Sequence, residues 1–197
     1  VIGFYSDYEN MNGVCTQSGC CTLAELDTVV SGGEARVYGA EFLLSQSFQQ
    51  KDWRFPIQLS GTYTIAEFQN SFQTQFPEWW NGTVGTSGTG TTGDPVPYIP
   101  DWQAQLSLGV GKRNWKTYVN FHYLGEMADQ AAIEGRRVID PRLVIGLSGF
   151  YQFSNSFKVR ARVDNITDER YAVSRRPFGL RPGRPMMAML GVEYEFF

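Results

Sequence analysis

The sequence has no apolar run near the roughly 18 residues that a membrane-spanning helix needs, and its mean hydropathy is −0.29. It is also short of charge, because Asp, Glu, Lys and Arg make up 19% of the residues, against about a quarter in ordinary soluble domains. The net charge of −3 argues against a nucleic-acid partner. A β-barrel stays compatible with these shortages, since only alternate residues of a barrel strand face lipid.

Histidine is nearly absent. His122 is the only one, and it falls on the polar side of a predicted strand beside Asn120. No second ligand type clusters with it, so we predict neither a metal site nor a Ser–His–Asp site. The chain is therefore expected not to be an enzyme and to carry no cofactor.

Cysteine is confined to one cluster, Cys15, Cys20 and Cys21. The spacing matches no zinc pattern. In an oxidising compartment Cys15 would pair with Cys20 or Cys21 and close a surface loop. The alternative, three unpaired thiols, stays open.

Alternation is what the sequence has in quantity. In residues 186–197 every second residue is apolar, and the intervening set includes Glu193 and Glu195, which predicts a strand with one oily and one wet face. Seven further segments predict strands on the same grounds. They cover residues 1–10, 31–48, 53–68, 102–110, 115–124 and 142–153, and a segment that starts at Phe157. The expected fold is all-β and antiparallel, with about eight strands and no helix.

The connections between these strands alternate in length. Three are short (49–52, 111–114 and 154–156), and four are long (11–30, 69–97, 125–141 and 174–185). Outer-membrane barrels have short periplasmic turns and long extracellular loops. The pattern therefore predicts a transmembrane β-barrel with a periplasmic C-terminus, and it places Val1 at a periplasmic turn.

Two further stretches carry a family resemblance. Residues 157–171 read FKVRARVDNITDERY, followed by SRRPFGLRPGRP and a last strand that ends in Phe. This order resembles the C-terminus of TonB-dependent outer-membrane receptors, in which a strand leads into N-[LI]-x-[DN]-x-x-Y. The GGEARVYGAE run within residues 29–42 resembles an internal strand of that family. The usual final Phe corresponds to Phe196, so Phe197 is an extra residue.

The resemblance implies that residues 1–197 are the last third of a barrel of about 22 strands. The family's plug domain is not in this chain, which starts at Val1 and is either processed or a fragment. Many Gln, Ser, Thr and Gly at lumen positions suit a wide, wet interior. The alternative is a self-closed eight-stranded barrel with a structural or adhesive role.

The same resemblance implies a function. A receptor of the ferric citrate or ferric siderophore type imports an iron chelate, with energy that reaches the plug through TonB. Its barrel contacts outer-membrane lipid and lipopolysaccharide. A barrel enzyme is the other rival, and it would need a Ser/His pair that His122 does not form.

The candidate ligand residues are arginines and tryptophans in the long loops. Guanidinium groups attract anions and bind carboxylates in two-pronged fashion. Strand order places two arginine-bearing loops side by side, so we predict an anion-gathering rim. Contact with lipopolysaccharide phosphates and a register-setting structural role are the alternatives. Two tryptophans would close over the ligand or simply pack their loop. The candidates are Arg136, Arg137, Arg175, Arg176, Arg181, Trp79 and Trp80.

The strand faces follow from counting by twos. Leu143, Ile145, Leu147 and Tyr151 are predicted to face lipid, and Lys158, Arg160 and Arg162 the lumen.

Overall fold

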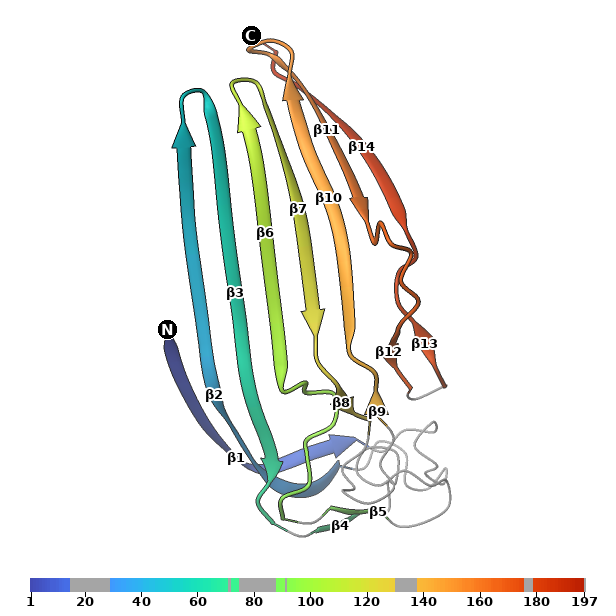
Figure 1. The fold of residues 1–197 in the computed structure, drawn as a ribbon. Coiled ribbons are helices and arrows are strands. Elements are labelled where there is room, and N and C mark those ends of the chain that lie inside the picture. The colour runs from blue at the N-terminus through green and yellow to red at the C-terminus, as the bar shows by residue number, and fades with distance from the viewer. Residues whose placement is uncertain are drawn as a thin grey trace.

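A computed structural model describes residues 1–14, 29–70, 72–74, 88–90, 92–129, 138–175 and 179–196. Eight long strands form one curved antiparallel sheet, in which spatial neighbours follow each other along the chain (Figure 1). They are β1 (Ile2–Val14), β2 (Val29–Gln50), β3 (Trp53–Phe68), β6 (Trp102–Lys112), β7 (Trp115–Leu124), β10 (Arg142–Gln152), β11 (Phe157–Asp164) and β14 (Met187–Tyr194). No helix in these ranges is long and apolar enough to cross a membrane.

The long connections carry short hairpins that the sequence pattern did not predict. They are β4 (Phe72–Thr74) with β5 (Gly88–Gly90), β8 (Met127–Ala128) with β9 (Val138–Ile139), and β12 (Ala172–Ser174) with β13 (Arg181–Pro182). All three lie at one end of the sheet, which we call the long-loop end (Figure 1). The tight turns lie at the opposite, short-turn end.

The tight turns are built by local chemistry. Gln50 pairs with Trp53 and Lys112 with Trp115, which leaves two residues in each turn. Lys51 and Arg113 take left-handed backbone conformations, with φ of 54° and 48°, as two-residue hairpin turns require.

The sheet has one apolar and one polar face, because residues that pair across neighbouring strands share a face. One row of pairs across five strands is wholly apolar: Leu44, Leu59, Leu106, Phe121 and Ile145. The adjacent row on the other face is Ser45, Gln58, Ser107, Asn120 and Gly146. There Asn120 accepts a hydrogen bond from Ser107 at 2.9 Å and donates to Ser148 at 3.3 Å. The predicted alternation of faces is confirmed.

The predicted face residues divide accordingly. Leu147 pairs with Val163 and Tyr151 with Val159, so the apolar set of β10 continues onto β11. Lys158, Arg160 and Arg162 occupy the opposite face. Many apolar side chains are exposed, among them Leu44, Leu143 and Leu190, whereas the buried apolar residues Ala35, Ala66, Phe68, Met127, Ala128 and Ile139 all lie toward the long-loop end. The sheet therefore has no central core of its own, and its apolar face needs an outside cover.

Aromatic side chains border the apolar face at two levels. Trp53 and Trp115 meet edge-on with ring centroids 5.8 Å apart near the short turns. Tyr63 and Trp102 meet at 4.7 Å toward the long loops. Trp53 and Tyr63 belong to one strand, and about ten residues at ~3.3 Å each, tilted by ~40°, give a height of about 25 Å. That is the height of the apolar band on outer-membrane barrels.

The edges of the sheet differ from a closed barrel. Within the described residues, β1 pairs only with β2 and β14 only with β11. The eight strands therefore form an open wall and not the self-closed barrel that was the alternative prediction.

The predicted position of Val1 at the short-turn end is wrong. Ile2 pairs with Glu41, so β1 begins beside the middle of β2 (Figure 1). Contacts across the pair hold this register: Arg36 makes a 2.9 Å ion pair with Asp7, and the ring centroids of Tyr5 and Tyr38 lie 6.4 Å apart.

Candidate functional site

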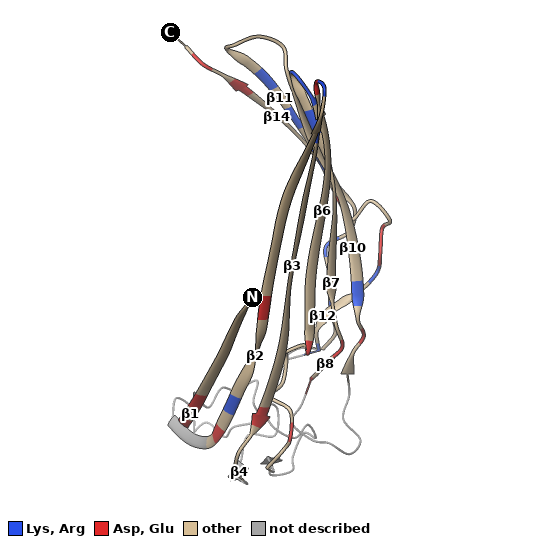
Figure 2. Cartoon of the chain, turned by 60° about the vertical axis from the view of Figure 1, so that its left-hand side comes forward, with Lys and Arg blue, Asp and Glu red and all other residues tan. Residues whose placement is uncertain are grey.

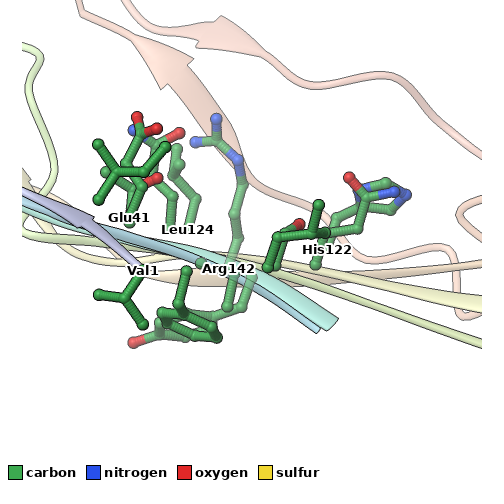
Figure 3. Close-up of a pocket in the computed structure, with 15 residues that line it drawn as sticks. Val1, Glu41, His122, Leu124 and Arg142 are labelled. Atoms are coloured by element: carbon green, nitrogen blue, oxygen red, sulfur yellow. The ribbon is translucent and has the colours of Figure 1, made fainter. Parts of the chain in front are cut away.

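A hollow of about 660 Å³ lies toward the long-loop end, and polar-face side chains make up much of its lining (Figure 3). Two rows of pairs cross it. One row contains Ile2, Glu41, Thr62, Gln103, Leu124 and Arg142, and the next contains Leu43, Ser60, Gln105, His122 and Val144. In Figure 3 the side chains of Glu41, Leu124 and Arg142 stand on the same side of the sheet. The wall thus offers an acid, a guanidinium and several neutral hydrogen-bonding groups to whatever fills the lumen.

Arg142 is a residue that the sequence analysis missed. One of its terminal nitrogens donates to the carbonyl of Ala172 at 3.0 Å, and its guanidinium carbon lies 5.0 Å from the ring centroid of Tyr171. Gly183 also packs against the Tyr171 ring, and any side chain at position 183 would collide with the ring atoms Cε2, Cζ and Cδ2. The backbone amide of Gly183 donates a hydrogen bond to the Tyr171 carbonyl at 2.7 Å. The only sequence signal was Tyr171 itself, the last residue of the N-I-T-D-E-R-Y motif.

Asn165, the first residue of that motif, orders the connection between β11 and β14. Its side-chain amide donates to the carbonyls of Glu169 and Arg184, at 3.0 Å each, and its carbonyl accepts from the Glu169 amide at 2.8 Å. Asp168 accepts a bond from the Met186 amide at 3.1 Å. The motif is thus a clasp whose side chains replace missing strand pairing.

The described ends of the two predicted arginine-bearing loops, residues 138–139 and 172–175, lie together. Arg175 is half-buried, and its Nε donates to the carbonyl of Val138 in β9 at 3.3 Å. Strand β12 also lies against β9. Arg181 is exposed in β13, opposite Ser174. Arg175 therefore connects residue 175 to β9, a contact of the structural kind that was one of the alternatives for these arginines.

Several candidates fall outside the described residues. They are Arg136, Arg137, Arg176, Trp79, Trp80, Cys15, Cys20 and Cys21. Their predicted roles stay predictions.

Ion pairs mark the polar face of the last two strands. Glu193 accepts from Lys158 at 3.2 Å and from Arg160 at 2.6 Å, and Asp164 accepts from Arg162 at 2.7 Å. No group of His, Cys, Asp and Glu in the described ranges is suited to hold a metal ion. The polar face is thus lined by hydrogen-bonding and charged groups.

Several solved outer-membrane receptors and transporters contain a similar sheet. The ferric-catecholate import receptor Fiu from E. coli K12 superposes with a TM-score of 0.62 at 17% identity, over 98% of this chain and 24% of the receptor. The pyoverdine outer-membrane receptor FpvA from Pseudomonas aeruginosa PAO1 gives 0.66 at 15% identity, over 98% and 26%. The copper transporter OprC gives 0.58 at 17%, over 85% and 24%. The chain spans about a quarter of the length of these proteins.

No curated protein matches the sequence. The family model for the TonB dependent receptor-like β-barrel, however, matches residues 1–166. That span covers most of the chain. The family match agrees with the apolar band, with the polar face and with the superposition on receptor barrels. The chain therefore belongs to the TonB-dependent receptor family and is part of the β-barrel of such an outer-membrane receptor, not an enzyme.

Proposed function

We propose that residues 1–197 are the C-terminal part of a receptor that imports an anionic ferric chelate, of siderophore or citrate type, with energy supplied through TonB. The observation that carries the proposal is the likeness of the whole eight-stranded wall to an import receptor for ferric catecholates and to a receptor solved with pyoverdine bound. Coupling to TonB would run through a plug domain outside this chain.

The orientation follows from loop length. Long loops of outer-membrane barrels are extracellular and short turns periplasmic. The long-loop end, with its three hairpins, would thus receive the chelate, and the C-terminus would lie in the periplasm. The hollow beside Glu41 and Arg142 would then line the upper part of the lumen.

The proposed rim consists of the arginines of two loops, with Trp79 and Trp80 as candidate aromatic cover. The Arg175–Val138 hydrogen bond supports it, because it holds residues 138–139 beside residues 172–175 and so draws both loops to one mouth. Guanidinium groups there would gather an anion through their summed field and hold it by charge-assisted bonds.

The test is uptake of radiolabelled ferric citrate and ferric siderophores by cells that carry the complete receptor. Arg136→Gln with Arg137→Gln, and Arg175→Gln with Arg176→Gln, keep hydrogen-bonding capacity and remove charge. We expect each pair to lower affinity about tenfold or more and to reduce the salt dependence of binding.

Two controls sharpen this experiment. Arg175→Lys keeps the charge and alters the bond to Val138, so it separates loop structure from ligand contact. Exposed Arg170→Gln removes a charge elsewhere. If the arginine variants take up the ferric chelates normally and the cells change in detergent sensitivity, the arginines contact lipopolysaccharide and not the ligand. If the unaltered receptor takes up copper but no ferric chelate, the proposed iron cargo is wrong.

A further inference from the structure

Three cations line up across the polar face near the short-turn end, although they come from strands far apart in the chain. Arg54 pairs with Gly111, Gly111 with Lys116, Lys116 with Phe150, and Phe150 with Arg160. We call Arg54, Lys116 and Arg160 the cationic row. Each is two strands from the next, so their backbones are about 10 Å apart.

The two residues between the cations are Gly111, which has no side chain, and Phe150, whose ring lies on the same face as the cations. A Cβ at Gly111 would lie 2.6 Å from Cγ of Lys116, so the lysine stem occupies the space above the glycine. Gly191, the partner of Arg160 on the far side, has nothing within 4 Å of such an atom. The lysine stem thus covers Gly111 and the row is open beyond Arg160, whereas Phe150 occupies the position between Lys116 and Arg160.

Charge along the row is unbalanced. Arg160 shares Glu193 with Lys158, but no ion pair in the described ranges joins Arg54 or Lys116 to a carboxylate. Both side chains line a hollow of about 240 Å³ between the two neighbouring turns, in which Asp52 is the one acid and already holds Arg113 at 3.2 Å. Figure 2 shows Lys and Arg gathered at this end of the sheet.

We propose that the cationic row is an anion-binding strip that takes the carboxylate groups of a small polyanionic solute inside the lumen. It rests on the proposed function, since that solute would be the imported chelate, held near the periplasmic exit. Cations on backbones about 10 Å apart suit a molecule with two or more carboxylates, because each carboxylate can then bind a different side chain.

Lysine acetylation with free citrate as the probe tests the strip at the site itself. In the complete receptor, purified in detergent, we expect citrate to slow acetylation of Lys116 about fivefold or more, as bound carboxylates shield the amine. Lys112, whose amine lies 5.3 Å from the ring centroid of Trp53 on the apolar face, is the internal control and should change by less than about twofold. Mass spectrometry of the peptides reads both lysines in one sample.

Variants show whether the row acts as a unit. Arg54→Gln with Arg160→Gln should raise the citrate concentration that protects Lys116 about tenfold, whereas Arg170→Gln with Arg184→Gln, which removes equal charge at the other end, should not. Equal Lys116 reactivity with and without citrate in the unaltered receptor overturns the proposal, whatever the variants do. Lys116 that is protected before citrate is added, and unchanged by it, also overturns it and assigns the row to an acidic protein segment.

The outcome is separable from the test of iron uptake. Protection of Lys116 without iron transport would leave the strip standing and remove the import function. Iron transport without protection of Lys116 would support the import function and overturn the anion-binding strip.

Discussion

Asn165 is the residue on which the connection between β11 and β14 depends most. The residue is 1% exposed, and its side chain makes three hydrogen bonds to backbone groups. Its backbone is left-handed, with φ of 52°, a conformation that asparagine tolerates better than most residues.

Asn165→Ala should therefore lower the free energy of unfolding by about 2–4 kcal/mol, since two carbonyls and one amide lose their partners in a buried place. Urea unfolding of the complete receptor in detergent measures this. Ile166→Ala, at the exposed neighbour, is the matched control and should cost far less. Equal losses for the two variants would refute the clasp.

A second prediction at this scale concerns the faces of β10. Ile145 lies in the middle of the apolar band and should contact lipid, so Ile145→Arg should cost roughly 2–4 kcal/mol near the midplane. Val144→Arg, one residue away on the polar face, should cost much less. The measurement is unfolding of the receptor in lipid vesicles, and similar costs would mean that the faces are wrongly assigned.

Among the elements, the start of β10 and the last long loop act together through Arg142. Its bond to Ala172 and its position over Tyr171 hold the two against each other. Arg142→Gln should raise hydrogen exchange of residues 171–185 by about tenfold or more while the long strands keep their protection, since only local contacts are lost. Arg170→Gln should leave exchange there unchanged. Unaltered exchange in Arg142→Gln would show that the loop is held by its own hairpin.

The connection between β1 and β2 carries the cysteine prediction. Val14 pairs with Val29, so the two ends of this segment are held one strand spacing apart. We expect a disulfide from Cys15 to Cys20 or Cys21. Mass spectrometry of unreduced peptides from freshly isolated membranes checks it, and three alkylatable thiols would rule it out.

At the scale of the molecule, the sheet is a wall with open edges. Within the described residues, β14 and the half of β2 nearer the short turns have one strand neighbour each. Unpaired edges are unstable in lipid and tend to join other strands.

The 197-residue chain refolded alone in detergent should therefore form oligomers or aggregates and not a heat-resistant monomer. Gel mobility with and without boiling, together with light scattering, distinguishes these states. The complete receptor is the control. A heat-resistant closed monomer of the isolated chain would support the alternative prediction of a self-closed eight-stranded barrel.

The sequence alone determined the strands, their faces and the division into short turns and long loops. These features depend on a period of two and on turn residues such as Lys51 and Arg113, which are local. The N-I-T-D-E-R-Y motif indicated the family, whereas the hydrogen bonds of Asn165 within it are known only from the structure. The described ends of the arginine loops, residues 138–139 and 172–175, are neighbours as predicted, because neighbouring strands bring their connections together.

Only the tertiary structure decided which residues share a row across the sheet. A slip of two residues between strands keeps every side chain on its face, so alternation cannot distinguish one such register from another. The alignment of Arg54, Lys116 and Arg160, the start of β1 beside Glu41, and the contact of Arg142 with Tyr171 all depend on that choice. Register is set by the sum of turn geometry and cross-strand contacts, which exist only once the strands have paired.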